Sequence, residues 1–485
     1  MKTYSVIIIG SGFGGQCAAI NLSKMGISDF LILERRDFMG GTWCQNSYPG
    51  AAVDVQSPLY SISSEPYQWS QMFAEQDELE EYTNHVVDKY DLRAKTETNA
   101  NVLSVTWDET SQSWDVQTET KGTFRAQILI NASGPLSTPV TPNFPGRDSF
   151  KGKSFHTNNW DHSYDYAGKR VAIIGSGASA AQVIPAIAGK VQHLHVFQRS
   201  PHWVLPRPDK RFNKFERHLL GIKPLYKALR SIIYWSLESR VIGFKYSKQM
   251  LNLVAQKAAL RHIKKQIPDP ALRAKLTPDY TIGCKRIILS NTLYPALAGQ
   301  NASLYTRDQG ISAINETGIL TQDGQQLDVD LIVYSTGYDA TDGVISYPVT
   351  GRDGQTLGKF WEQFPRAYLG TSIPGFPNLF VVTGPNTGIG HTSAIFVIEA
   401  QMSYIMKSIA TLKQKNVRAI EVTPEAEADY TQMIHAEMEK TVWKTGGCQS
   451  WYQSKSGHVV AMFPGFSFTY RQMAQAFKPD HHTYS

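Results

Sequence analysis

Two glycine-rich turns, each directly after a short apolar run, constrain this chain more than any other feature of its sequence. The first turn, Gly10–Gly15, follows the run Val6–Ile9. The second turn, Gly175–Ala180, follows Arg170–Ile174. A buried strand, a glycine turn and an apolar-periodic helix form the βα unit that holds dinucleotide phosphates at its helix N-terminus. Two such units predict an α/β protein with two Rossmann-like nucleotide-binding domains.

The first turn has the residues that a dinucleotide requires. Gly10 allows the tight bend, Gly12 lets the backbone approach a pyrophosphate, and Gly15 lets the helix pack closely on the strand. Glu34 ends the next strand about 20 positions further on, where an acid accepts hydrogen bonds from an adenosine ribose. These four residues are therefore candidate cofactor contacts.

The second turn repeats this pattern with a different ending. Its candidate contacts are Gly175, Gly177 and Ala180. The strand after its helix, His193–Gln198, leads into Arg199 at the place where an acid would otherwise stand. An arginine there favours a ribose with a 2′-phosphate, so NADP is expected over NAD, with Ser200 assisting.

Two further motifs lie around these turns. One has the pattern F-x-G-x-x-x-H-x-x-x-W-D and consists of Phe150, Gly152, His156, Trp160 and Asp161. The other has the pattern G-G-x-W-x-x-x-x-Y-P-G-x-x-x-D and runs from Gly40 to Asp54. Either motif alone could be a surface loop. Together, with the Gly40–Asp54 motif first in the chain, they resemble the signatures of the type I Baeyer–Villiger monooxygenases. This resemblance covers nearly the whole chain.

This resemblance implies FAD and NADPH as cofactors and assigns further contacts to them. Those to FAD are Trp43, Asp54, Tyr60 and Val102. Those to NADP are Lys285 and Trp451, and Arg286 is expected at the flavin. Gly384 and Asn386 belong to a glycine-rich turn before an apolar helix, where backbone N–H groups can stabilise an anionic flavin edge.

The implied reaction uses NADPH and molecular oxygen to insert one oxygen atom beside a ketone carbonyl, giving an ester or lactone through a flavin C4a-peroxide. Arg286 and Asp54 are the expected catalytic residues, because a positioned cation stabilises developing negative charge. The alternatives are a flavin-containing monooxygenase that oxidises nitrogen or sulfur, an uncoupled NADPH oxidase, and a regulatory nucleotide-binding module. The ending Trp160-Asp161 counts against the first, and Arg286 with Asp54 counts against the last.

The expected domain organisation has three parts. Residues 1–145 form the first part of the FAD-binding domain, and a proline-rich linker closes it. Residues 146–334 form the NADP-binding domain, with a helical insertion at about 210–275. Residues 335–485 complete the FAD-binding domain and add a C-terminal segment. In the insertion, apolar residues at helical spacing among many Lys and Arg predict packing within the insertion more than contact with a membrane.

Composition limits the partners and the compartment. The 485 residues have a formal net charge of +6 without zinc-finger or RNA-binding motifs, so no nucleic acid is expected. No metal site is expected, because His193 and His195 lack a further ligand cluster. The chain has no run of about 18 apolar residues, so no transmembrane segment is expected. A strand near the N-terminus leaves no room for a secretory signal, which favours the cytoplasm. The oligomeric state stays open.

The four cysteines are scattered without C-x-x-C spacing: Cys17, Cys44, Cys284 and Cys448. We therefore expect no disulfide scaffold. The spacing also counts against a disulfide reductase, which needs a paired redox thiol beside its flavin. The tail residues His481 and His482 are expected to be disordered.

Overall fold

The computed structural model describes residues 1–485, except for the side chain of Lys248. Its larger sheet contains eight strands in the order β17-β4-β5-β6-β1-β2-β3, with β18 also paired to β6. These strands are β1 (Lys2–Ile9), β2 (Phe30–Leu33), β3 (Thr96–Glu97), β4 (Val102–Asp108), β5 (Ser113–Thr118), β6 (Thr123–Asn131), β17 (Val349–Thr350) and β18 (Leu379–Val381). Strands β4, β5 and β6 are antiparallel to one another, and β6 joins them to the parallel strands by pairing with β1.

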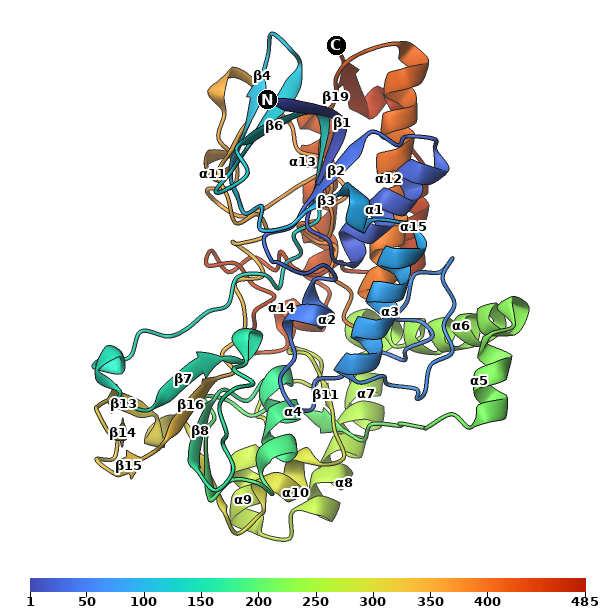
Figure 1. The fold of residues 1–485 in the computed structure, drawn as a ribbon. Coiled ribbons are helices and arrows are strands. Elements are labelled where there is room, and N and C mark those ends of the chain that lie inside the picture. Colours follow the sequence, from blue (N-terminus) through green and yellow to red (C-terminus); the bar gives the residue numbers. More distant parts are fainter.

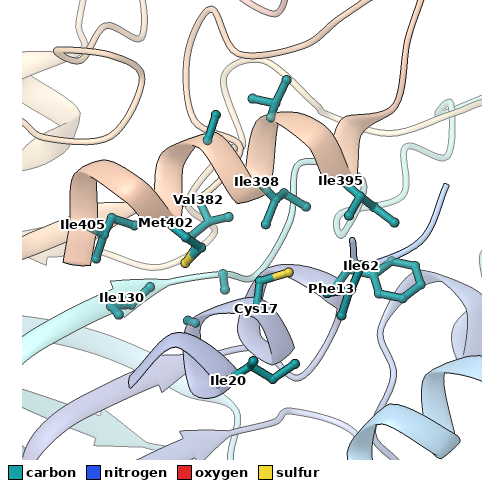
Figure 2. Close-up of a cluster of buried hydrophobic side chains, with 14 of the residues drawn as sticks. Phe13, Cys17, Ile20, Ile62, Ile130, Val382, Ile395, Ile398, Met402 and Ile405 are labelled. Carbon is teal, nitrogen blue, oxygen red and sulfur yellow. The ribbon is translucent and has the colours of Figure 1, made fainter. Parts of the chain in front are cut away.

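Strand β1 lies at the centre of this sheet, parallel to β2 on one side and to β6 on the other. Its last four residues, Val6–Ile9, are buried, which explains why they are all apolar. The first glycine turn then leads into α1 (Phe13–Lys24), which packs against α12 (Ala394–Lys415). Figure 2 shows Phe13, Cys17 and Ile20 of α1 below Ile395, Ile398 and Met402 of α12.

Among the described residues, α12 is the one helix that is long and apolar enough to cross a membrane, with a mean hydropathy of 1.2 over its most apolar window. Within the protein, 72% of that window is buried. The helix therefore belongs to the core of the first domain, and its apolar length is explained by packing on α1.

The second sheet has five parallel strands in the order β12-β9-β8-β16-β7. They are β7 (Lys153–His156), β8 (Arg170–Ile174), β9 (His193–Phe197), β12 (Ala302–Tyr305) and β16 (Leu331–Tyr334). Helices α4 (Ala178–Ile187) and α10 (Leu293–Leu297) pack on this sheet. A small antiparallel sheet lies beside it and contains β13 (Ile311–Ile314), β14 (Gly318–Thr321) and β15 (Gln326–Asp328). The predicted α/β class with two Rossmann-like domains is confirmed, and Figure 1 shows the two sheets one above the other. The domain limits given above stay a prediction.

In Figure 1, the first two helices of the helical insertion, α5 and α6, project to one side, whereas its last two, α8 and α9, lie at the second domain. The insertion contains α5 (Lys214–Leu220), α6 (Lys223–Glu238), η4 (Ile242–Tyr246), α7 (Lys248–Leu251), η5 (Asn252–Gln256), α8 (Lys257–Gln266) and α9 (Pro270–Leu276). The prediction that its apolar residues pack within the insertion is only partly right. Leu220 is buried, but Phe215 is 69% exposed and Leu225 is 46% exposed.

The remaining elements connect the two sheets or close the first domain. They are α2 (Thr42–Gln45), α3 (Gln76–Lys89), β10 (Val204–Leu205), β11 (Ile288–Leu289), α11 (Leu357–Phe360), β19 (Ile420–Val422), α13 (Pro424–Met438), α14 (Val442–Thr445), α15 (Ser467–Gln475) and β20 (His482–Tyr484). The expectation of a disordered tail is wrong. Strand β20 pairs with β19, and the buried ring of His482 hydrogen-bonds the Tyr404 hydroxyl at 2.7 Å.

Candidate active site

The first glycine turn has the geometry of a phosphate site. Gly10 has φ +101°, and a Cβ there would lie 2.5 Å from the carbonyl oxygen of Ala132. Helix α1 begins after Gly12 without any side-chain cap, so its first N–H groups are available to an anion. Glu34 is buried beside the turn, where its carboxylate accepts hydrogen bonds from the N–H of Ser11 at 3.0 Å and its hydroxyl at 2.6 Å.

Aromatic side chains stand next to this turn. The indole N–H of Trp43 on α2 donates to the Tyr60 hydroxyl at 3.2 Å. The ring of Phe13, the first residue of α1, meets Tyr60 edge-on at 5.9 Å. Val102 is buried at the start of β4, in the core cluster that also contains Leu33 of β2. Trp43 and Tyr60 thus come together, while Val102 lies in a different core cluster, with Leu33.

The centre of the candidate site is the pair formed by Asp54 and Arg286, which lie 232 positions apart in the chain. The guanidinium donates from Nε to Oδ2 and from Nη2 to Oδ1, both at 2.6 Å. Each side chain is about one third exposed, 34% for Asp54 and 33% for Arg286. Burial acts to raise the pKa of Asp54, but the charge and hydrogen bonds of Arg286 outweigh it and lower that pKa. The carboxylate in turn raises the pKa of Arg286, so the pair stays ionised.

The second turn repeats the geometry of the first. Gly175 has φ +126°, and a Cβ there would lie 2.2 Å from the carbonyl oxygen of Ser335. Helix α4 begins after Gly177 without a side-chain cap, and the space where a Cβ of Gly177 would stand is open for 4 Å. Ala180 is fully buried in the first turn of α4. An uncapped helix start that faces open space fits a pyrophosphate.

Three predicted NADP contacts gather beyond this turn. The ammonium of Lys285 donates to the Ser200 hydroxyl at 2.7 Å and lies 4.9 Å from the centre of the Tyr280 ring. Burial lowers the pKa of Lys285, and the neighbouring charge of Arg199 lowers it further. Arg199 is exposed, and the described residues provide no ion-pair partner for it. Two cations and a hydroxyl form a donor set that fits a phosphate monoester.

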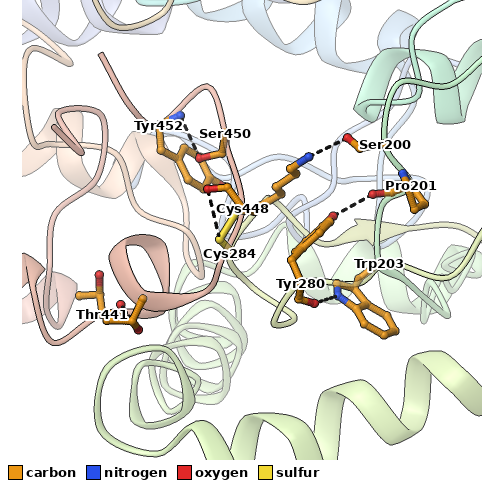
Figure 3. Close-up of a disulfide and its surroundings, with 11 residues drawn as sticks. Ser200, Pro201, Trp203, Tyr280, Cys284, Thr441, Cys448, Ser450 and Tyr452 are labelled. Atoms are coloured by element: carbon orange, nitrogen blue, oxygen red, sulfur yellow. Dashed lines mark hydrogen bonds between the residues drawn. A yellow bond between two sulfur atoms is a disulfide. The ribbon is translucent and has the colours of Figure 1, made fainter. Parts of the chain in front are cut away.

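The loop that carries Lys285 and Arg286 is tied to the C-terminal segment by a disulfide between Cys284 and Cys448 (Figure 3). Cys284 is buried, and Trp451 lies three positions beyond Cys448 with 45% of its side chain exposed. No disulfide scaffold was expected, and this single bond was not predicted from the sequence. The spacing of 164 positions gave no signal, because the two cysteines meet only through the tertiary fold.

The turn before α12 is engaged with the same C-terminal segment. The side-chain amide of Asn386 donates to the carbonyl oxygens of Val459 and Met462, both at 3.0 Å. Gly384 packs closely, since a Cβ there would lie 2.3 Å from the Gly370 carbonyl oxygen. The side-chain amide and the backbone N–H of Asn386 are thus both bound to the C-terminal segment, so Asn386 mainly ties the turn to that segment.

The motif at residues 150–161 belongs to the second domain, and its segment contacts Gln45 and Ser47 of the first. His156 ends β7 and accepts a hydrogen bond from the N–H of Asn158 at 3.0 Å. The amide of Asn158 donates to the Tyr338 hydroxyl at 3.1 Å, and that hydroxyl donates to Asn46 at 2.7 Å. Trp160 is buried in the core of the second domain. The segment therefore connects the loop after the first glycine unit with the second sheet.

Two residues of the site carried no sequence signal. The amide of Gln182 on α4 donates to the Ala52 carbonyl at 2.8 Å and accepts from the Tyr48 hydroxyl at 2.9 Å, so it links the two domains. His202 hydrogen-bonds the backbone of Arg286, and burial followed by the charge of Lys285 lowers its pKa to about 4. No motif surrounds either residue, and only the fold brings them to the site.

These features define a flavoprotein-type oxidoreductase with two dinucleotide sites and an arginine–carboxylate pair between them. A family model for pyridine nucleotide-disulphide oxidoreductases matches residues 7–223. The chain is 42% identical to a Baeyer–Villiger monooxygenase of Pseudomonas aeruginosa, over 97% of this chain and 90% of the relative. It is 43% identical to a Baeyer–Villiger monooxygenase of Streptomyces coelicolor, over 96% and 90%.

Solved structures agree with these relatives. Cyclohexanone monooxygenase from Rhodococcus sp. Phi1 bound to NADP+ has a TM-score of 0.90 at 28% identity, covering 100% of this chain and 99% of that structure. An oxidised steroid monooxygenase bound to NADP has a TM-score of 0.89 at 29% identity, with the same coverage. The chain belongs to the Baeyer–Villiger monooxygenases. It is an FAD- and NADPH-dependent flavin monooxygenase of type I, as the sequence motifs predicted.

Proposed function

We propose that Arg286 and Asp54 act as the catalytic pair of this Baeyer–Villiger monooxygenase, which converts a ketone to an ester or lactone with NADPH and molecular oxygen. The observation that carries the proposal is the bidentate contact of these side chains at 2.6 Å. The contact joins Asp54, which follows the first dinucleotide unit, to Arg286 in the loop before β11.

Bound FAD would supply the electron transfer and the activation of oxygen. The residues that would hold it are those of the first turn with Glu34, Trp43 and Tyr60. NADPH would lie at the second turn, with its 2′-phosphate between Arg199, Ser200 and Lys285 and with Trp451 against it. These assignments rest on the uncapped helix starts and on the cation cluster described above.

Arg286 provides a permanent positive charge at the place where the substrate reacts. When a nucleophile adds to a ketone, the carbonyl oxygen gains negative charge, and a preorganised cation stabilises that charge without reorganisation. Asp54 fixes the guanidinium plane through two hydrogen bonds and leaves its remaining N–H donors for the substrate. We propose the cytoplasm as the location of this NADPH-consuming reaction.

The test is product analysis with a panel of linear, cyclic and aryl ketones under labelled oxygen. We expect esters or lactones that each carry one labelled oxygen atom. Arg286→Ala should still accept electrons from NADPH but should form ester at least about 100-fold more slowly. Arg352→Ala removes an arginine that is also paired with carboxylates, Glu109 and Glu421, but lies in the turn after β17, and it should leave ester formation unchanged.

Two results would reject the assignment. Efficient oxidation of sulfides or amines without any ester would favour the heteroatom-oxidising class, and hydrogen peroxide as the only product would favour an oxidase. Ester formation by Arg286→Ala at the wild-type rate would reject the role of Arg286 alone.

A further inference from the structure

The helical insertion concentrates both the positive charge and the exposed apolar side chains of this protein. Residues 210–266 contain fourteen Lys and Arg against two Glu, whereas the whole chain has a net charge of only +6. The rest of the chain is therefore net negative. Among the described residues, eleven of the seventeen large hydrophobic side chains that are exposed belong to the same segment. They are Phe215, Ile222, Leu225, Ile232, Trp235, Ile242, Tyr246, Met250, Leu253, Val254 and Leu260, and we call them the insertion surface.

Helix α6 shows why this exposure is unusual. One face is buried and includes Tyr226, Ile233 and Leu237. The opposite face is also apolar, because Leu225, Ile232 and Trp235 recur at helical spacing and are 46%, 69% and 59% exposed. A helix that is apolar on both faces is normally covered on both. The outer face of α6 therefore indicates a partner outside the chain.

The insertion surface is continuous between α6 and η4. The ring of Trp235 lies 5.9 Å from that of Phe468 on α15, and Phe468 stacks on Phe466 at 4.9 Å. Phe466 stacks in turn on Tyr246 at 6.1 Å, and Tyr246 is 61% exposed. This row of aromatic rings joins the two exposed regions, and aromatic rings with one wet edge are typical of a membrane interface.

Cations accompany the apolar residues on α8. Its buried face is formed by Ala259, His262 and Ile263. Its exposed face carries Lys257, Arg261 and Lys264 around Leu260, and none of these three cations has an ion-pair partner among the described residues. Basic residues beside an apolar stripe are the composition of a helix that lies in the interface of an anionic membrane.

We propose that the insertion surface docks on an anionic phospholipid membrane, with the apolar side chains in the headgroup region and the cations on the lipid phosphates. The charge favours lipid over a second copy of the chain, because two insertions of the same strong positive charge would repel each other. The docked helix also adjoins the candidate active site. Ile233, Tyr234 and Leu237 of α6 pack on Val55 and Leu59, next to Asp54 and Tyr60.

The test is co-sedimentation of the full-length, FAD-loaded protein with large vesicles of phosphatidylcholine alone or mixed equally with phosphatidylglycerol. We expect at least about tenfold tighter binding to the anionic vesicles, and weaker binding as salt is raised. The double variant Ile232→Ser/Trp235→Ser and the double variant Lys257→Glu/Arg261→Glu should each bind about tenfold more weakly or worse. Leu103→Ser, at an exposed leucine of β4 that is 43% exposed, should bind as the wild type does.

Flavin content and thermal melting of each variant show that it is folded, so a loss of binding reports the surface itself. Absence of binding to anionic vesicles, or wild-type binding by both double variants, would overturn the proposal. Light scattering tests the alternative that a second copy of the chain binds this surface. A wild-type dimer that Ile232→Ser/Trp235→Ser converts to a monomer would identify the surface as a contact between two copies and would also overturn it.

Discussion

At the scale of single residues, the site depends on charged side chains, and the pair of Arg286 and Asp54 is the clearest case. Arg286 has its two hydrogen bonds to Asp54, and both side chains are one-third exposed. A charge pair in this position gains more from hydrogen bonding than an exposed pair, but solvent still screens part of its attraction. Its contribution to folding is therefore modest, and its main effect is to hold the guanidinium in one orientation.

This pair has a defined pH dependence. The folded-state pKa of Asp54 lies below the ordinary value of 3.8. The pair therefore stabilises the fold fully above that ordinary value, and the contribution is lost as the pH falls through the lowered pKa. Asp54→Asn should reduce the free energy of unfolding by about 1–2 kcal/mol. Urea denaturation at a series of pH values should show a constant difference from about pH 8 to pH 5 and a smaller difference below about pH 4. A difference that grows toward acid pH would contradict this account.

The cation cluster at the second turn determines cofactor choice. Arg199 and Lys285 face the same small region, and Ser200 holds the ammonium at 2.7 Å. Arg199→Ala or Lys285→Ala should raise the KM for NADPH by about 10-fold to 100-fold and change the KM for NADH by less than about twofold. Arg307→Ala, an exposed arginine in the same domain, is the matched control. Equal effects on the two coenzymes would show that the cluster does not recognise the 2′-phosphate.

At the scale of elements, the loop from Tyr280 to Ile288 is held on two sides. On one side, the carbonyl of Tyr280 accepts the indole N–H of Trp203 at 2.9 Å, and β11 pairs with β10. On the other side, Cys284 is bonded to Cys448 in the segment that carries Trp451 (Figure 3). The disulfide thus connects the catalytic loop to the predicted NADP contact, and the two should lose order together when it is broken.

We therefore predict that Cys448→Ser lowers both stability and coenzyme affinity. A native disulfide typically contributes about 2–4 kcal/mol to stability. The variant should melt several degrees lower and have a raised KM for NADPH, and mild reduction of the wild type should have the same effect.

Cys44→Ser is the control, because Cys44 is free and burial raises the pKa of its thiol to about 12, which leaves it unreactive. Thiol titration of the denatured wild type should find two free thiols before reduction and four after it. Unchanged melting and KM in Cys448→Ser would show that the disulfide has no role in the site.

At the scale of the whole molecule, local sequence patterns predicted the parts, and the fold determined how the parts meet. Strand Arg170–Ile174 begins and ends as the sequence predicts, and Phe30–Leu33 ends directly before Glu34. The Cys284–Cys448 bond has no local signal, because it depends on the packing of segments far apart in the chain. The tail was misjudged for a related reason. His482 is polar in sequence, but its ring is buried through a hydrogen bond to Tyr404, a residue 78 positions earlier.

Polar contacts join the two domains beside their apolar packing, and a pair of these polar contacts gives the last prediction. Gln182 of α4 provides two of them, to Tyr48 and to the Ala52 carbonyl, just before Asp54. Gln182→Ala removes both, and it leaves the Tyr48 hydroxyl and the Ala52 carbonyl without these partners. We expect looser closure between the two dinucleotide units, a several-fold higher share of NADPH consumed without ester, and a melting temperature within a few degrees of the wild type. The measurement is the ratio of ester formed to NADPH consumed. Gln326→Ala, at an exposed glutamine of β15 in the same domain, should keep the wild-type ratio. If Gln182→Ala also keeps that ratio, the domains are held by other contacts. The hydrogen bonds that join Asn158, Tyr338 and Asn46 are then the next ones to test.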